Sequence, residues 1–403
     1  MIKQPFILFT LALLAGNVQA QKPYSLQGDF PGAADGTKVY LLDAFEYKKA
    51  VLQDSAVIKD GHFQLKGKAP WGFGRQVQLF VEKTPGVPQD RRVVRFFMGD
   101  EDVKISCQVD SLPGSYYGKG GSMNNVVITG ARSQDVYASY KAGVRELSEK
   151  YSALNAAYMK EYHLPAINDT FNTARGIELA REMKETDKQL TVKKIAFIKE
   201  NRSSVVAAYM ALEVIAGSHS SLTAAEIDGI TAMLSPKLAT STIVKELKRT
   251  VANEKVIAKG AKYIDIPLIN RQGKTVQLSS MVKPGQYNML EFWASWCGPC
   301  RAEIPHLRAL SKSVKSSDFN IISVSIDERK ADWEKAMNEE KMEWTQLCDM
   351  KGFSGPVSQR YKVEGIPFSI VIDPNGKIVA SEIRGAVLDA LVKDLLGDKV
   401  TAF

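Results

Sequence analysis

The stretch WCGPC at 296–300 constrains the fold more than any other part of the chain. An apolar, strand-like run at 287–293 leads into it, and an amphipathic, helix-like run at 301–310 follows it. A cysteine at the first turn of a helix is reactive because the free N–H groups and the positive end of the helix dipole stabilise its thiolate. Two intervening residues also let both sulfurs meet within one turn. The stretch therefore predicts a redox site at a strand–helix junction.

The size and charge of the chain narrow its class. A chain of 403 residues is too long for one ordinary core, so we expect two or three domains. Its composition, 45% apolar and 24% charged, is that of a soluble globular protein. The net charge of +8 is not gathered into a basic stripe with interleaved aromatic residues. Nucleic acid is therefore not an expected partner.

Residues 1–20 have the pattern of a secretory signal peptide. Lys3 supplies a short positive region, residues 5–15 an apolar one, and residues 18–20 a small-residue cleavage site. The apolar run is too short to span a bilayer comfortably, and no cysteine follows it that could carry a lipid anchor. We predict cleavage after Ala20 and export to the periplasm, with an uncleaved anchor as the alternative.

Two cysteines lie outside the pair, at Cys107 and Cys348. An exported protein of this size with only four cysteines does not depend on a framework of disulfides. Both lie in strand-like runs, and both are predicted to behave as small buried hydrophobic residues. A third redox thiol is the alternative for Cys348, because it shares a domain with the pair.

Residues 21–131 have the pattern of an antiparallel β-sandwich. Short runs rich in β-branched and aromatic residues recur about every ten residues, and turn signals such as Asp35-Gly36 and Asp60-Gly61 separate them. The predicted strands cover 24–30, 38–43, 51–58, 62–66, 75–81, 93–97, 102–109 and 126–129.

Residues 132–258 are polar and helix-periodic, which predicts a small α-helical region. Asp169 is a candidate N-cap, and Thr223 with Glu226 forms a candidate capping box. Neither this region nor the β-rich one contains a cluster of catalytic residue types, so the sequence leaves their roles open. The predicted helices cover 133–162, 170–200, 203–215, 223–234 and 241–256.

Residues 259–403 alternate strand-like and helix-like segments, which predicts a layered α/β domain. The cysteine pair then falls at the carboxyl end of an inner strand, where such sheets place their sites. The predicted strands cover 276–278, 287–293, 319–326, 345–348, 368–373 and 377–383, and the predicted helices 297–315, 330–341, 355–361 and 386–397.

The position of each cysteine suggests its role in thiol–disulfide exchange. Cys297 is at the helix start and is the predicted nucleophile, whereas Cys300 lies one turn inside and is the predicted resolving thiol. A resolving thiol needs a base. Glu291 lies within the apolar strand, where burial would raise its pKa, and Glu303 is three residues after Cys300. His306, a further turn along, is a weaker candidate.

These residues carry a resemblance to a known family. The run EFWASWCGPC at 291–300, Pro305 and Gly365-Ile366-Pro367 resemble the thioredoxin superfamily. Glu303, the extra helix and strand at 332–348, and the signal peptide make the chain similar to the exported TlpA/ResA-like branch. The β-rich and helical segments resemble, more loosely, those that precede such domains in exported disulfide reductases.

The resemblance implies a role for each matching residue. Pro367 would be a cis-proline facing the cysteines, with the backbone of Ile366 pairing with a bound peptide and Trp296 contacting the substrate. Glu291 matches the buried acid of thioredoxins, and Glu303 the acid of the ResA-like branch. The sequence departs from the usual pattern at Phe368, where thioredoxins usually have Thr, and in having Glu rather than Asp at 291.

The expected function is that of a periplasmic thiol–disulfide oxidoreductase that mainly reduces protein disulfides. The resemblance implies disulfide-containing client proteins and a membrane electron donor of the DsbD/CcdA type, and we expect no cofactor and no metal. The alternatives are a thiol peroxidase of the same superfamily and a non-enzymatic client-binding or chaperone protein.

Overall fold

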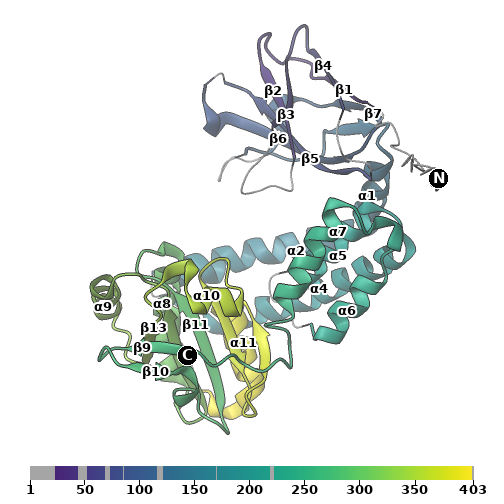
Figure 1. The fold of residues 1–403 in the computed structure, drawn as a ribbon. Helices are drawn as coiled ribbons and strands as arrows, with labels where there is room; N and C mark the ends of the chain where they lie inside the picture. Colours follow the sequence, from purple (N-terminus) through teal and green to yellow (C-terminus); the bar gives the residue numbers. More distant parts are fainter. Residues whose placement is uncertain are drawn as a thin grey trace, which may run out of the picture. The chain divides into compact units, whose positions relative to one another are not determined.

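The structure, a computed structural model, describes residues 23–43, 52–68, 73–84, 86–115, 121–168, 170–217 and 222–401. The predicted signal peptide and the predicted N-cap Asp169 lie outside these residues. The chain divides into two units, one ending at Asp135 and the other beginning at Val136 (Figure 1).

In the described residues of the N-terminal unit, the strands form two four-stranded sheets, ordered β4-β1-β7-β8 and β3-β2-β5-β6. Both sheets supply side chains to one core, including Leu26 and Ile105 from the first sheet and Leu41 and Leu79 from the second. The strands are β1 (Tyr24–Asp29), β2 (Lys38–Asp43), β3 (Leu52–Val57), β4 (His62–Gly67), β5 (Arg75–Glu82), β6 (Arg91–Met98), β7 (Asp102–Ser106) and β8 (Val127–Thr129).

The prediction of a β-rich N-terminal region is confirmed, but its antiparallel pairing is wrong at one place. Strands β1 and β7 pair in parallel, with Leu26 opposite Val103, whereas the other strand pairs of this unit are antiparallel. Strands so far apart in sequence need no hairpin, so turn signals alone could not give their relative direction.

The helical region forms the first part of the second unit. Its segments, from the last residues of the first unit onward, are α1 (Arg132–Gly143), α2 (Arg145–Tyr158), a π-helical turn (Met159–His163), α3 (Leu164–Ala166), α4 (Thr173–Glu200), α5 (Val205–Ile215), α6 (Ala224–Ala232) and α7 (Thr242–Glu254). The single helix predicted at 133–162 is wrong, because Val144 leaves the helical conformation and separates α1 from α2. The predicted capping box is confirmed: the N–H of Glu226 donates to Thr223 Oγ1, and the N–H of Thr223 donates to the Glu226 carboxylate.

The C-terminal domain is built on a seven-stranded sheet in the order β10-β9-β13-β12-β11-β14-β15. The strands are β9 (Pro267–Asn270), β10 (Thr275–Gln277), β11 (Tyr287–Trp293), β12 (Phe319–Ser325), β13 (Thr345–Cys348), β14 (Phe368–Ile372) and β15 (Ile378–Ser381). The sequence reading missed β9, a short strand. Strand β11 lies between β12, which is parallel to it, and β14, which is antiparallel.

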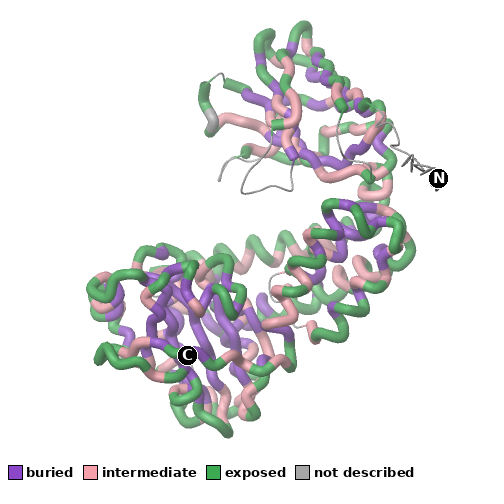
Figure 2. The backbone as a smooth tube through the Cα atoms, in the orientation of Figure 1, coloured by how far each residue is buried: buried purple, intermediate pink, exposed green. Residues whose placement is uncertain are grey.

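Helices cover both faces of this sheet. On one face α8 (Gly298–Ser313) and α11 (Gly385–Leu396) pack on Met289, Ile321 and Val371. On the other, α9 (Lys330–Glu339) and α10 (Pro356–Tyr361) share a core with the alternate residues of the same strands. Strands β12 and β14 are consequently buried along their whole length, as expected for inner strands of a sheet with both faces covered. Figure 2 shows the middle of this sheet as buried. The predicted α/β fold of this domain is confirmed.

Among the described residues, no helix is both long enough and apolar enough to cross a membrane.

Candidate active site

The cysteine pair lies where β11 ends and α8 begins. Cys297 is the N-cap of α8, and its Sγ accepts a hydrogen bond from the N–H of Cys300 at 3.2 Å. The two cysteines form a disulfide across a Cα–Cα distance of 5.2 Å. The N–H of Cys300, in the first helical turn, therefore points at the sulfur that would carry the thiolate after reduction.

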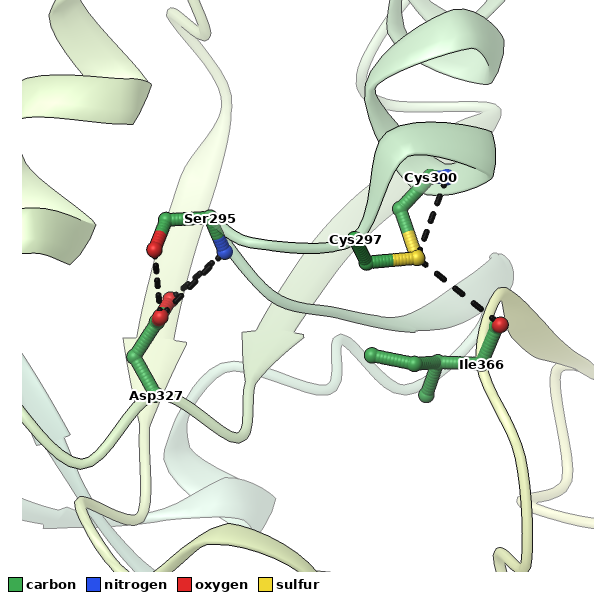
Figure 3. The surroundings of a disulfide bond; sticks show 5 residues. All are labelled: Ser295, Cys297, Cys300, Asp327 and Ile366. Atoms are coloured by element: carbon green, nitrogen blue, oxygen red, sulfur yellow. Dashed lines mark hydrogen bonds between the residues drawn. A yellow bond between two sulfur atoms is a disulfide. The ribbon is translucent and has the colours of Figure 1, made fainter.

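A loop from the other side of the sheet covers the pair. The Ile366–Pro367 peptide bond is cis, and the Ile366 carbonyl oxygen lies 3.8 Å from Cys297 Sγ (Figure 3). Cys300 is fully buried and Cys297 is only 5% exposed. Cys297 is thus the more accessible sulfur of the two, but it is less exposed than an attacking thiolate was predicted to be, because the Ile366 loop lies against it.

An acid that the sequence reading missed fixes the loop before the cysteines. Asp327 follows β12, and its carboxylate accepts hydrogen bonds from both the N–H and the hydroxyl of Ser295 (Figure 3). Ser325 donates to the same carboxylate at 2.7 Å. Because β11 and β12 are adjacent and parallel, their carboxyl ends meet. That adjacency, with a Ser after one strand and an Asp after the other, is the signal that could have found this contact.

Glu291 is buried on β11, as predicted. Its side chain is 2% exposed, and neither carboxyl oxygen has a hydrogen-bond partner of ordinary geometry among the described residues. Burial raises the pKa of Glu291 to about 8, against a smaller lowering by the Ser323 hydroxyl on the neighbouring strand. The residue lines a small cavity of about 10 Å³ together with Glu303 and Pro367. Glu291 is therefore an acid that can take up or release a proton near neutral pH.

Glu303, the other predicted proton-transfer residue, is held by different contacts. Its Oε1 is 2.9 Å from His306 Nδ1 and accepts a hydrogen bond from the N–H of Gly385 at 2.8 Å. Burial would raise the pKa of Glu303, but the charge and hydrogen bond of His306, with the Gly385 N–H and Arg384, outweigh burial and lower it. Glu303 is thus an ionised partner of His306 and a weak proton acceptor at neutral pH.

His306 joins two carboxylates inside the protein. Its Nε2 lies 2.8 Å from Asp389, which is fully buried on α11. Burial would lower the pKa of His306, but Asp389 and Glu303 together raise it to about 10. The ring is therefore an imidazolium at neutral pH, which leaves it no free nitrogen to act as a base.

The helical region contributes to the same cluster. The hydroxyl of Tyr162, in the π-helical turn, donates to the second oxygen of Asp389 at 3.2 Å. The hydroxyl of Tyr158, at the end of α2, accepts from the N–H of Ala386. We call Glu303, His306, Asp389 and Tyr162 the buried clasp. Only Glu303 and His306 were considered from the sequence, since Tyr162 and Asp389 are 227 residues apart in the chain.

The remaining candidates lie apart from this cluster. Trp296 is 60% exposed, and its ring centroid is 6.1 Å from that of Phe353, which is also exposed. Cys107 and Cys348 are free and buried, and burial raises their pKa values to about 12 and about 11. Both therefore behave as the predicted buried hydrophobic residues. Within the described ranges, no group of three or more His, Cys, Asp or Glu could hold a metal ion.

A helix-capping disulfide beside a cis-proline loop, on a central strand of a layered α/β sheet, defines the class of this domain. The C-terminal domain is a thioredoxin-like thiol–disulfide oxidoreductase domain. Residues 259–381 match the AhpC/TSA family. Residues 24–137 match a domain of unknown function, DUF4369. The family resemblance inferred from the sequence is confirmed.

Curated relatives agree with this class. The chain is 26% identical over 145 residues to the thiol-disulfide oxidoreductase ResA of Bacillus subtilis, a match that covers 36% of this chain and 78% of that protein. It is 35% identical over 122 residues to ResA of Oceanobacillus iheyensis, covering 30% of this chain and 58% of that protein.

Solved structures that are similar to this chain include the thioredoxin domain of a thiol-disulfide oxidoreductase from Bacteroides vulgatus. It is 35% identical to this chain, with a TM-score of 0.32, and the match covers 34% of this chain and 98% of that one. A thiol-disulfide oxidoreductase from Bacteroides fragilis is 32% identical, with a TM-score of 0.32, over 34% of this chain and 99% of that one.

Proposed function

We propose that this protein is a periplasmic reductase of protein disulfides that works by exchange through Cys297 and Cys300. The observation that carries the proposal is the disulfide at the N-terminus of α8, lying under the Ile366–Pro367 loop. The placement of Cys297 at the helix N-cap favours its thiolate, which is the attacking species in such an exchange.

The reaction would proceed in two displacements. The Cys297 thiolate attacks one sulfur of a client disulfide, so that a Cys297–client disulfide forms and the other client cysteine leaves as a thiolate, which takes a proton from solvent. Cys300 then loses its proton and attacks Cys297 Sγ. The intramolecular disulfide closes, the second client thiol is released, and two electrons have passed from this chain to the client.

Glu291 is the proton acceptor that we assign to the second displacement. It lies on the strand that leads into the cysteines, and its raised pKa matches proton transfer near neutral pH. The small cavity that it lines has room for about one water molecule. Glu303 is less suited to this step, because His306 and Gly385 already hold its carboxylate.

The location and the electron donor are parts of the same proposal. A signal-peptide pattern at 1–20 supports export. A reductase in an oxidising compartment must be reduced again after each turnover, and we propose a membrane donor of the DsbD/CcdA type for this step.

Reduction of insulin disulfides, with dithiothreitol as the electron source, tests the proposal. Cys297→Ser is expected to abolish the reaction, and Cys300→Ser is expected to accumulate a mixed disulfide with the substrate through Cys297. Full activity of Cys297→Ser would end the proposal. Rapid peroxide turnover without a disulfide substrate would instead favour a thiol peroxidase. Complementation of a deletion strain by the double Cys variant would favour a non-enzymatic binding protein.

A further inference from the structure

A cleft of about 1040 Å³ separates the helical region from the thioredoxin-like domain within the C-terminal unit. One wall belongs to the thioredoxin-like domain and includes Pro299, Ile366, Pro367 and Phe368. The opposite wall belongs to the helical region. The cleft lies at the upper end of the roughly 300–1,000 Å³ of small-molecule pockets, so it has room for several residues of a peptide.

The wall that belongs to the thioredoxin-like domain lies next to the redox sulfur. Ile366 lines the cleft, and its carbonyl oxygen lies 3.8 Å from Cys297 Sγ. In the described part of the chain, the N–H of Ile366 donates to no backbone carbonyl, although Phe368, two residues on, is already paired in β14. A free backbone group at the end of a strand is a site where an extended peptide can add by main-chain hydrogen bonds.

The helical wall presents apolar side chains to this cleft. Met159 and Ile167 line it and are 36% and 40% exposed, and Tyr151, Tyr158 and Met183 line it beside them. Exposed apolar side chains gathered along a cleft indicate contact with a partner. Methionine in particular adapts to partners of different shape.

Contacts between the two walls hold the helical wall in place. Arg249 of α7 donates to Glu364, which lies two residues before Ile366, and it also pairs with Glu246. Asn253 of α7 bonds the same Glu364. The buried clasp fixes the π-helical turn to α11, and Tyr158 fixes the end of α2 to the same helix by accepting from the N–H of Ala386. Arg249, Glu246 and Glu364 pair with one another, so these three charged residues of the lining are already engaged within the protein.

We propose that the helical region forms half of the client-binding cleft. The occupant is an extended, cysteine-bearing segment of a client polypeptide with apolar side chains next to its cysteine. Its backbone pairs with Ile366, and its apolar side chains pack on Met159 and Ile167. This inference rests on the proposed function, since it names the part of the protein that selects the client for that reaction.

The test uses the full-length protein and two substrates, with dithiothreitol as reductant. One substrate is a peptide with an intermolecular disulfide flanked by Leu and Phe, and the other is bis(2-hydroxyethyl) disulfide, which is too small to span both walls. The measured quantity is the ratio of kcat/KM for the peptide to kcat/KM for the small disulfide. Met159→Glu and Ile167→Glu are each expected to lower this ratio about tenfold, mainly by raising KM for the peptide.

Val192→Glu is the matched control, because Val192 is an exposed apolar residue of α4 that does not line the cleft. It is expected to leave the ratio as it is in the unsubstituted protein. An unchanged ratio in Met159→Glu and Ile167→Glu would overturn the inference, whether both rates persist or fall together. A dimer that forms with the unsubstituted protein and is lost in Met159→Glu would assign the wall to a second copy and also overturn it. Failure of the unsubstituted protein to reduce either substrate would count against the proposed function instead.

Discussion

Glu291 lies in the middle of β11, and the two strands next to β11, β12 and β14, are buried. Its pKa of about 8, set mainly by burial, has a consequence for stability that can be measured apart from catalysis. The unfolded chain releases this proton above about pH 4.5, whereas the folded chain keeps it until about pH 8. The free energy of unfolding therefore falls as the pH rises between these values, by up to about 5 kcal/mol.

Glu291→Gln removes this titration. We expect the variant to gain stability relative to the unsubstituted protein as the pH is raised from about 5 to about 8. Urea unfolding of the oxidised proteins at the two pH values measures the gain. The cost of burying the amide is the same at both values, so the difference isolates ionisation of Glu291. A stability difference that does not change with pH would contradict the raised pKa.

The kinetic role of Glu291 has a separate test. If it accepts the proton of Cys300, Glu291→Gln should slow the decay of the Cys297–client disulfide by about 10²-fold, the lower range for general acid–base catalysis. Quenched-flow trapping of the mixed disulfide measures this decay. Glu303→Gln is the comparison, and it should slow the decay less, because Glu303 is already an ionised partner of His306. The reverse order would move the proton transfer to Glu303.

At the scale of elements, the buried clasp joins α8, α11 and the π-helical turn of the helical region. An imidazolium between two buried carboxylates is stable only while both partners remain, because a buried charge without its partner loses solvation that nothing replaces. The clasp is therefore a structural link between the helical region and the thioredoxin-like domain as well as a neighbour of the redox site.

Asp389→Asn should lower the free energy of unfolding by about 3 kcal/mol, since it removes one of the two charges that face His306. Asp394→Asn is the matched control on the same helix. Asp394 is exposed and pairs with Arg181 of α4, so its loss should cost about 0–1 kcal/mol. Urea unfolding at pH 7 compares the two. Equal losses would show that the clasp contributes no more than a surface ion pair.

Sequence patterns predicted the elements well where local signals decide them. In the C-terminal domain β11 and β13 have the predicted bounds, because apolar runs between turn signals mark buried strands. The patterns failed at β9, which is too short for a clear period, and at the break at Val144, which lies inside a helix-periodic run. The parallel pairing of β1 with β7 depends on long-range contacts that periodicity does not report.

The residues of the site also fall into two groups, those that local sequence patterns predicted and those that they did not. The predicted strand–helix junction gave the correct positions of Cys297 and Cys300, and the apolar run at 287–293 correctly predicted that Glu291 is buried. Asp327 and Asp389 were missed because each is defined by a residue far away in the chain. The roles assigned to Trp296, Ile366 and Glu303 remain predictions, although the structure places Ile366 next to Cys297.

At the scale of the whole molecule, two of the three regions carry no catalytic cluster that the sequence identifies. The helical region now has an inferred role as one wall of a cleft. The N-terminal unit has its own core of two sheets, and its matched family has no described function.

Export of the protein would change the length of the whole chain. If residues 1–20 are removed during secretion, the mature protein begins at Gln21. Mass spectrometry of the protein from the periplasmic fraction of a Gram-negative host should give the mass of residues 21–403. Recovery of the full 403-residue chain from the membrane fraction would favour an uncleaved anchor.

The central claim is that Cys297 attacks clients and Cys300 resolves the mixed disulfide. It is tested most directly by alkylating the reduced, full-length protein with iodoacetamide across a pH series and mapping the modified cysteine by mass spectrometry. We predict that Cys297 alone reacts in the folded protein, with a rate that titrates at a lower pH than that of an ordinary cysteine, because the N-terminus of α8 stabilises its thiolate. Preferential modification of Cys300, or a Cys297 titration at or above about 8.5, would contradict the claim.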